Sequence, residues 1–383
     1  MRLSIVTSAL VAVLVGFGGS VAVVLSAAEA VGATAAETSS WIAMLCVSMM
    51  ATSLVLSWHH RMPIVTAWST PGAALIATGT GVGLAEAVGA FVFCAALILL
   101  TALVGPLGRL VSRIPARIAS AVLAGVLFPF VIGVVGAAEA SPLVALPMVA
   151  VFLVVRLISP AWAVIAVLGL GIALCYGLGL VVPGEGFMLS RFVWVTPVFD
   201  PGTLISLGLP LYLVTMASQN LPGFAVLRAD AYDVPSRSIL GVTGLASLLT
   251  AGFGAHTTSL AAITASICTG QDAHPDPAKR WLCGPVYALG YGVLALGAAS
   301  VVAYLAQFPP SLLVVIAGLA LAGPLIQSLS ASTVPGEDLF APVATFIVTA
   351  SGIAAFGLGS AFWGLVAGLV LTGLQRLLQA EKS

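Results

Sequence analysis

The stretch VTAWSTPGAALIAT, residues 65–78, interrupts an apolar segment with a Pro-Gly pair. A second stretch, LTAGFGAHTTSLAAIT at residues 249–264, resembles it closely. Each contains a Thr-Ala pair near its start, passes through residues poorly suited to a helix, and then becomes rich in small residues. Each stretch therefore predicts a segment that is extended strand in its first half and helix in its second half.

The composition around these stretches is that of a polytopic membrane protein. The 383 residues are 60% hydrophobic and 7% charged, with a mean hydropathy of +1.17 and no net charge. A soluble chain of this length could not cover its core with so few charges. The five cysteines are scattered and give no disulfide or metal framework.

Apolar segments between charges and turn signals predict an all-α protein with fourteen transmembrane spans. The N-terminus resembles a signal peptide, but its apolar run continues from Leu3 to Ala28 and is expected to be the first span. The predicted spans cover approximately 4–28, 40–58, 63–80, 84–107, 117–136, 141–156, 160–182, 203–227, 238–252, 254–270, 281–300, 309–330, 339–356 and 360–378.

The basic residues test this count independently. If the N-terminus is cytoplasmic and all fourteen spans are real, only Arg191 of the 13 basic residues lies on the outer side of the membrane. A missed or an extra span would move the basic residues after it to the opposite side and would destroy this asymmetry. Both termini are then cytoplasmic. The residues on the cytoplasmic side are Arg2, Arg61, Arg109, Arg113, Arg117, Arg156, Arg228, Arg237, Lys279, Arg280, Arg376 and Lys382.

The two interrupted segments are the third span of the first seven and the third span of the second seven. Because each half has an odd number of spans, the halves are inverted, and we expect a seven-plus-seven inverted repeat of residues 1–183 and 200–383. Short, interrupted spans at corresponding positions of inverted halves are typical of the central site of a transporter.

The two half-helices predict an anion site, because their N-termini would meet near the membrane centre with free N–H groups and a favourable dipole. Ser69 and Thr70 precede the first half-helix, and Thr257 and Thr258 are expected to begin the second. Simple helix capping is the alternative role for these side chains. We also expect the two extended segments to satisfy each other's backbone hydrogen-bonding groups.

Few titratable groups lie at membrane depth. His256 is the one predicted within a broken span, which makes it a candidate proton carrier, with a neutral, backbone-bonded histidine as the alternative. Glu86 is the second candidate. The spacing of Asp272, His274 and Asp276 suggests a metal site, but a cytoplasmic turn with local ion pairs is preferred. The basic residues are too dispersed for a nucleic-acid surface.

Two segments carry a family likeness: TMASQNLPGFAVLRADAY (215–232) and FGAHTTSLAAITASICTGQDAHPDPAKRW (253–281). Both closely resemble the signature regions of the benzoate/proton symporter family of bacterial inner membranes. The resemblance implies a multi-pass inner-membrane protein in which a core domain moves against a gate domain. The core would comprise residues 1–110 and 200–303, and the gate residues 111–183 and 304–383. Carriers of this fold are often dimers, so a homodimer is also expected.

The resemblance further implies a site among spans one, three, eight and ten. An amide in span eight suits an anion, because a carboxylate there would repel it. Gln219 and Asn220 are both expected to donate to the substrate. Gln219 is the first choice for direct contact, and the alternative role for Asn220 is to hold the broken backbone of span three or ten. The other implied substrate contacts are Gly18, Gly19, Ser20, Thr70, Pro71, Gly72, His256, Thr257 and Thr258, with the aromatic ring on Phe17, Tyr212 and Met216.

These features together predict import of benzoate or a similar aromatic carboxylate with a proton, by alternating access, without a cofactor or a metal and without enzymatic activity. Two alternatives stay open. One is a carrier or channel for another organic or inorganic anion. The other is a metal-dependent membrane transferase, which would depend on Asp272 and Asp276.

Overall fold

The computed structural model describes residues 2–79, 81–104, 115–182, 188–261, 263–334, 338–353, 355–356 and 358–380. Arg109, Arg113 and Lys382, which the charge partition used, lie outside these ranges, as does the side chain of Arg376.

Each predicted span corresponds to an element of the structure. Seven helices are long and apolar enough to cross a membrane, counting only described residues. They are Leu3–Ala30, Ala35–His60, Leu84–Leu103, Ala116–Ala140, Pro201–Ala229, Pro277–Leu305 and Pro310–Ser332. The first consists of α1 (Leu3–Gly18) and α2 (Val21–Ala30), so the N-terminal segment is a span as predicted. The next are α3 (Ala35–His60), α5 (Leu84–Leu103), α7 (Ala116–Ala140), α15 (Cys283–Leu305) and α16 (Pro310–Ser332).

The remaining unbroken spans are the helices α8 (Pro142–Ile158), α9 (Pro160–Gly177), α13 (Ser236–Ala251), α17 (Phe340–Ala350) and α18 (Ser360–Ala380).

The two interrupted spans are half strand and half helix, which confirms the prediction. Strand β1 (Thr66–Trp68) leads into α4 (Thr70–Thr78), and β2 (Thr258–Leu260) leads towards α14 (Ile263–Thr269). The strands pair antiparallel, with Ala67 opposite Ser259. Backbone bonds from Ser69 N to Thr257 O (3.2 Å) and from Ala261 N to Val65 O (3.1 Å) extend the ladder. The extended backbone is therefore satisfied inside the protein, which is the condition for its survival at this depth.

One boundary was wrong. Thr257 and Thr258 do not begin a helix, because Thr258 is the first residue of β2 and α14 begins only at Ile263. Pairing with β1 holds this segment extended. Thr258 also bonds to neighbouring helices. Its hydroxyl forms a 2.6 Å hydrogen bond with Ser48 Oγ, and its backbone N–H donates to Ser247 Oγ at 2.8 Å.

Span eight is helical throughout but changes its winding twice. It comprises α10 (Pro201–Thr203), the π-helical segment η1 (Leu204–Gly208), α11 (Leu209–Thr215), the π-helical segment η2 (Met216–Asn220) and α12 (Leu221–Ala229). In an α-helix the ring of Pro222 would clash with the carbonyl of Ser218, and its missing N–H would leave that carbonyl without a donor. The wider η2 turn, closed by Leu221 N donating to Met216 O, lies directly before this proline. Such π-bulges are frequent at functional sites.

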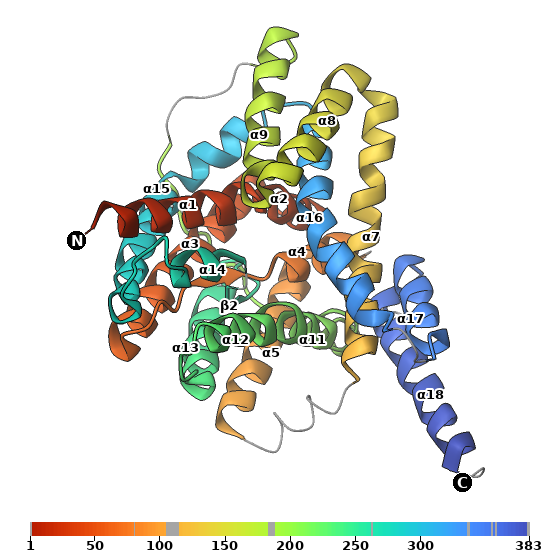
Figure 1. The fold of residues 1–383 in the computed structure, drawn as a ribbon. Helices are drawn as coiled ribbons and strands as arrows, with labels where there is room; N and C mark the ends of the chain where they lie inside the picture. The colour runs from red at the N-terminus through yellow and green to blue at the C-terminus, as the bar shows by residue number, and fades with distance from the viewer. Residues whose placement is uncertain are drawn as a thin grey trace.

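The two halves of the chain interlock. Helix α3 of the first half packs against α15 of the second, and α13 of the second half packs against α5 of the first. Helices α7 and α16 form a further pair across the halves. Figure 1 shows α7, α8, α16, α17 and α18 along the upper and right-hand side of the molecule, with α3, α5, α13 and α15 on the left. The division into core and gate stays a prediction.

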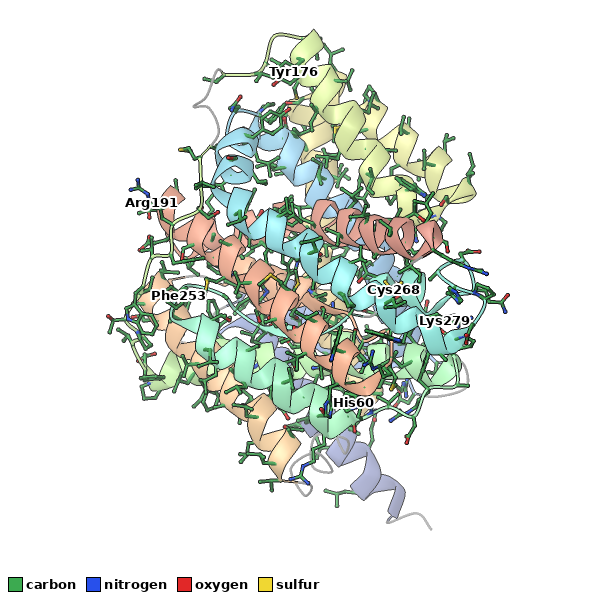
Figure 2. All side chains as sticks on the ribbon, turned by 90° about the vertical axis from the view of Figure 1, so that its left-hand side faces the viewer. His60, Tyr176, Arg191, Phe253, Cys268 and Lys279 are labelled. Carbon is green, nitrogen blue, oxygen red and sulfur yellow. The ribbon has the colours of Figure 1, made fainter. Side chains whose placement is uncertain are left out.

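Charged residues mark two opposite edges of the molecule. In Figure 2, Arg191 lies at the left-hand edge, whereas Lys279 lies near the right-hand edge. The charge pattern likewise places Arg191 and Lys279 on opposite sides of the membrane, and the assignment of the cytoplasmic side stays a prediction.

Candidate functional site

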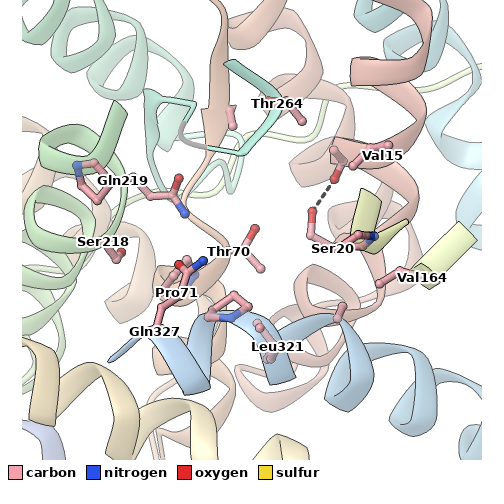
Figure 3. Close-up of a pocket in the computed structure, with 18 of the residues that line it drawn as sticks. Val15, Ser20, Thr70, Pro71, Val164, Ser218, Gln219, Thr264, Leu321 and Gln327 are labelled. Atoms are coloured by element: carbon pink, nitrogen blue, oxygen red, sulfur yellow. Dashed lines mark hydrogen bonds between the residues drawn. The ribbon is translucent and has the colours of Figure 1, made fainter. Parts of the chain in front are cut away.

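A cavity of about 670 Å³ lies between the broken spans and the helices α7, α8, α9 and α16. One wall comes from the α1–α2 junction, β1, the start of α4, η2 and α14, and the other from α7, α8, α9 and α16. The volume is in the range typical of small-molecule sites. Polar side chains that line it, shown in Figure 3, are Ser20, Thr70, Ser218, Gln219, Thr264 and Gln327.

Five of the predicted contact residues line this cavity: Gly19, Ser20, Thr70, Pro71 and Gln219. The break in the first span requires glycine at position 19, because a Cβ there would lie 2.6 Å from the carbonyl oxygen of Val15. Beside it, Ser20 donates to Gly16 O at 2.6 Å and accepts from the Trp68 indole N–H at 2.8 Å. Ser20 thus holds Trp68, which is itself part of the lining.

The two adjacent amides of η2 have different roles. Gln219 lines the cavity and forms no hydrogen bond with another described residue. Asn220 is fully buried, and its Oδ1 accepts from the backbone N–H of Leu260 at 3.0 Å. This bond confirms that Asn220 holds the broken backbone of span ten. Asn220 was also predicted as a substrate donor, but it is buried against β2 and does not appear among the residues that line the cavity.

His256 lies behind the cavity and is fully buried. The indole Nε1 of Trp41 donates to His256 Nδ1 at 3.0 Å, and His256 Nε2 lies 3.0 Å from the carbonyl oxygen of Ser69. Since an indole nitrogen can only donate, Nδ1 must accept, and the ring proton sits on Nε2. The imidazole is therefore neutral in this conformation, and it bonds to the residue that caps α4.

The N-terminus of α4 offers fewer free donors than the sequence suggested. The Ser69 hydroxyl accepts from Gly72 N at 3.1 Å, and Ser69 O accepts from Ala73 N at 2.8 Å. Pro71 has no N–H. The backbone N–H and hydroxyl of Thr70 are the groups left to meet a ligand, together with the helix dipole.

Several predicted contacts lie outside the cavity lining. Thr257 and Thr258 are fully buried around the strands, and Gly72 packs against Leu211. Glu86 lies at the start of α5, where its carboxylate accepts from Gly83 N at 3.1 Å. Gly18 is likewise not part of the lining.

The side chains predicted to contact the aromatic ring of the substrate do not line the cavity either. Phe17 packs edge-on against Trp68 with ring centroids 5.5 Å apart, so Trp68 rather than Phe17 faces the cavity. Tyr212 bonds to Thr101, and the Met216 sulfur accepts from Asn220 Nδ2 at 3.4 Å. The aromatic rings that line the cavity are Trp68, Phe152 and Tyr291.

Sequence reasoning missed Gln327 and Arg156, both of which line the cavity. Gln327 is an isolated amide in the apolar helix α16, a signal comparable to Gln219 in span eight. Arg156 was treated only as a marker of orientation. Neither residue could be assigned to the site without knowing that α8 and α16 face the broken spans.

The loop before α15 is a turn with a local ion pair, as predicted. Asp276 accepts from Ala278 N at 3.0 Å and lies 3.8 Å from Lys279 Nζ. The part of the chain that the structure describes contains no group of three side chains able to hold a metal ion.

Comparison with known proteins decides the family. Residues 1–374 match the family described as benzoate membrane transport protein. The chain belongs to this benzoate membrane transport family. It is 34% identical over 370 residues to the benzoate membrane transport protein of Acinetobacter baylyi (strain ATCC 33305 / BD413 / ADP1), covering 96% of this chain and 94% of that protein. It is 39% identical over 359 residues to inner membrane protein YdcO of Escherichia coli (strain K12), covering 93% and 92%.

Solved structures place this benzoate membrane transport family member in a known fold. The transmembrane domain of the cyanobacterial bicarbonate transporter BicA aligns with a TM-score of 0.60 at 16% identity, covering 96% of this chain and 98% of that one. SLC26A9 aligns with a TM-score of 0.67 at 13% identity, covering 97% of this chain and 65% of that one. The likeness shows the seven-plus-seven inverted-repeat fold. The chain is thus a multi-pass membrane transport protein of the bacterial inner-membrane type.

Proposed function

We propose that the protein imports benzoate or a similar aromatic carboxylate together with a proton, by alternating access. The observation that carries this proposal is the cavity itself, in which Gln219 and Thr70 present unsatisfied donors beside apolar and aromatic surface. The carboxylate would accept from the Gln219 amide and from Thr70 at the N-terminus of α4. Benzoate transport is the activity named for the Acinetobacter relative.

The aromatic ring would rest on the apolar part of the lining. Trp68 and Pro71 contribute from the predicted core, and Leu123, Phe152 and Leu321 from the predicted gate. Because both predicted domains contribute to one cavity, a movement of one against the other would open and close it. This supports core residues 1–110 and 200–303 moving against gate residues 111–183 and 304–383.

The cavity favours an inward-open arrangement in the proposed orientation. Its lining includes Arg156, Ser159 and Pro160 at the α8–α9 connection, and Ala331 near the end of α16. The charge pattern assigns this end of α8 to the cytoplasm, along with both termini. Release would then occur towards the cytoplasm, as import requires.

Proton coupling would act through His256. Protonation of Nδ1 requires the Trp41 bond to break, because the indole N–H and the added proton cannot share that nitrogen. The other ring nitrogen bonds Ser69, which caps α4 at the cavity. Protonation would therefore alter the segment that presents Thr70 to the carboxylate. Glu86, the second candidate, caps α5 away from the lining and is the weaker choice. Homodimer formation stays a prediction.

A carrier for another anion is the second candidate, favoured by the described activities of the structural neighbours, a bicarbonate transporter and an anion transporter. A thermal-shift screen of purified protein separates the two. We expect benzoate and close aromatic carboxylates to raise the melting temperature, and acetate, bicarbonate and sulfate to have little effect. Stabilisation by the small anions alone would overturn the choice of substrate.

A further inference from the structure

Arg156 is the single charged side chain among the described residues that line the cavity. It lies in the last turn of α8, on the wall opposite Gln219 and Thr70. A cationic group in a concave, partly apolar space attracts anions more strongly than the same group on an open surface.

Arg156 is half-buried, and its guanidinium lies against two neighbours. It lies 5.7 Å from the ring centroid of Phe152, one turn earlier on the same helix. It also reaches α16, since a Cβ built on Gly323 would lie 3.4 Å from Arg156 Nη1. An arginine that only anchors a helix end at lipid headgroups would extend outward instead.

No described carboxylate pairs with Arg156. The carboxylate of Asp276 pairs with Lys279, in a different loop. Arg156 also makes no hydrogen bond to another described residue. Its charge is therefore available to an anionic ligand.

Helix α16 places a second donor next to it. Gln327 lies four residues after Gly323, so both occupy the same face of the helix, and Gln327 lines the cavity (Figure 3). Gln327 forms no hydrogen bond with a described residue. The guanidinium from α8 thus lies against Gly323, and the Gln327 amide comes from the next turn of α16. A guanidinium and an amide that line one cavity form a donor pair suited to one carboxylate.

We propose that Arg156, assisted by Gln327, forms a second carboxylate station on the gate wall, which receives the substrate anion as it leaves Gln219 and Thr70. This inference rests on the proposed function, because the ligand is the same aromatic carboxylate. The station makes Arg156 a determinant of selectivity for anionic over neutral aromatic compounds.

Binding of benzoate to purified full-length protein tests the station. We expect Arg156→Gln to weaken benzoate affinity at least tenfold, and Arg156→Lys, which keeps the charge without the bidentate fork, to weaken it less. Gly323→Leu keeps the arginine but fills the space its guanidinium occupies, so it should reproduce the loss. Arg228→Gln removes an exposed basic residue from the end of α12, outside the lining, and should bind like the wild type.

The outcomes separate this inference from the proposed function. If the wild type binds benzoate and Arg156→Gln binds it equally well, the station is wrong and the proposed function stands. If Arg156→Gln and Arg228→Gln weaken binding to the same extent, the effect is one of overall charge and the station is again wrong. If the wild type binds no aromatic carboxylate, the proposed function fails and the station with it. Should Arg156→Gln fold poorly, the Gly323→Leu result decides.

Discussion

The indole N–H of Trp41 in α3 donates a 3.0 Å hydrogen bond to Nδ1 of His256, a residue 215 positions later in the chain. This bond joins the two inverted halves. The other ring nitrogen of His256, Nε2, bonds Ser69 O at the N-terminus of α4. A protonated imidazole could not accept the bond from Trp41. Protonation of Nδ1 would therefore break this bond and disturb the ring that also contacts Ser69 O at the start of α4.

Replacing His256 by glutamine separates a proton-carrying role from a structural one. Glutamine can accept from Trp41 and donate to Ser69 O, but it cannot bind a proton. We expect His256→Gln to fold and to exchange labelled benzoate for unlabelled benzoate across the membrane, while losing accumulation driven by a pH gradient. Accumulation equal to that of the wild type would assign His256 a purely structural role. Glu86→Gln serves as the control and should keep full accumulation.

Gln219 and Asn220 should respond differently to truncation. Asn220→Ala leaves the buried N–H of Leu260 without its acceptor, which costs about 1–3 kcal/mol of stability. Gln219→Ala removes a side chain that bonds no described residue, so the melting temperature should change little while benzoate affinity falls. Thermal unfolding with and without benzoate measures both effects. The reverse pattern would contradict the assignment of Gln219 to the ligand.

The acidic loop before α15 should not take part in transport. Asp272→Asn and Asp276→Asn together remove both carboxylates, and asparagine at 276 can still accept from Ala278 N. We expect uptake of labelled benzoate to stay within twofold of the wild type. Loss of uptake in the double variant, together with wild-type uptake that requires added divalent metal, would instead favour a metal-dependent role.

The sequence predicted the broken spans and the role of Asn220 because those signals are local. Some residues are unusual in an apolar helix, and they can be recognised from their immediate neighbours alone. Examples are a Pro-Gly pair, a Thr-Ser run and an amide, each of which indicates a break in the helix or a polar contact. The start of α14 was placed too early because pairing with β1, a segment nearly 200 residues away, holds Thr257 and Thr258 in extended backbone. Arg156 and Gln327 were missed for a related reason, since their place in the cavity depends on how α8 and α16 pack against distant elements.

Uptake of labelled benzoate into proteoliposomes with an acidic exterior tests the central claim most directly. Liposomes without protein provide the baseline, because neutral benzoic acid crosses bilayers unaided. We expect protein-dependent accumulation above the external concentration, acidification of the interior, and loss of both on addition of a protonophore. Protein-dependent uptake that only equilibrates benzoate, with the same rate whether or not a pH gradient is present, would contradict proton-coupled symport.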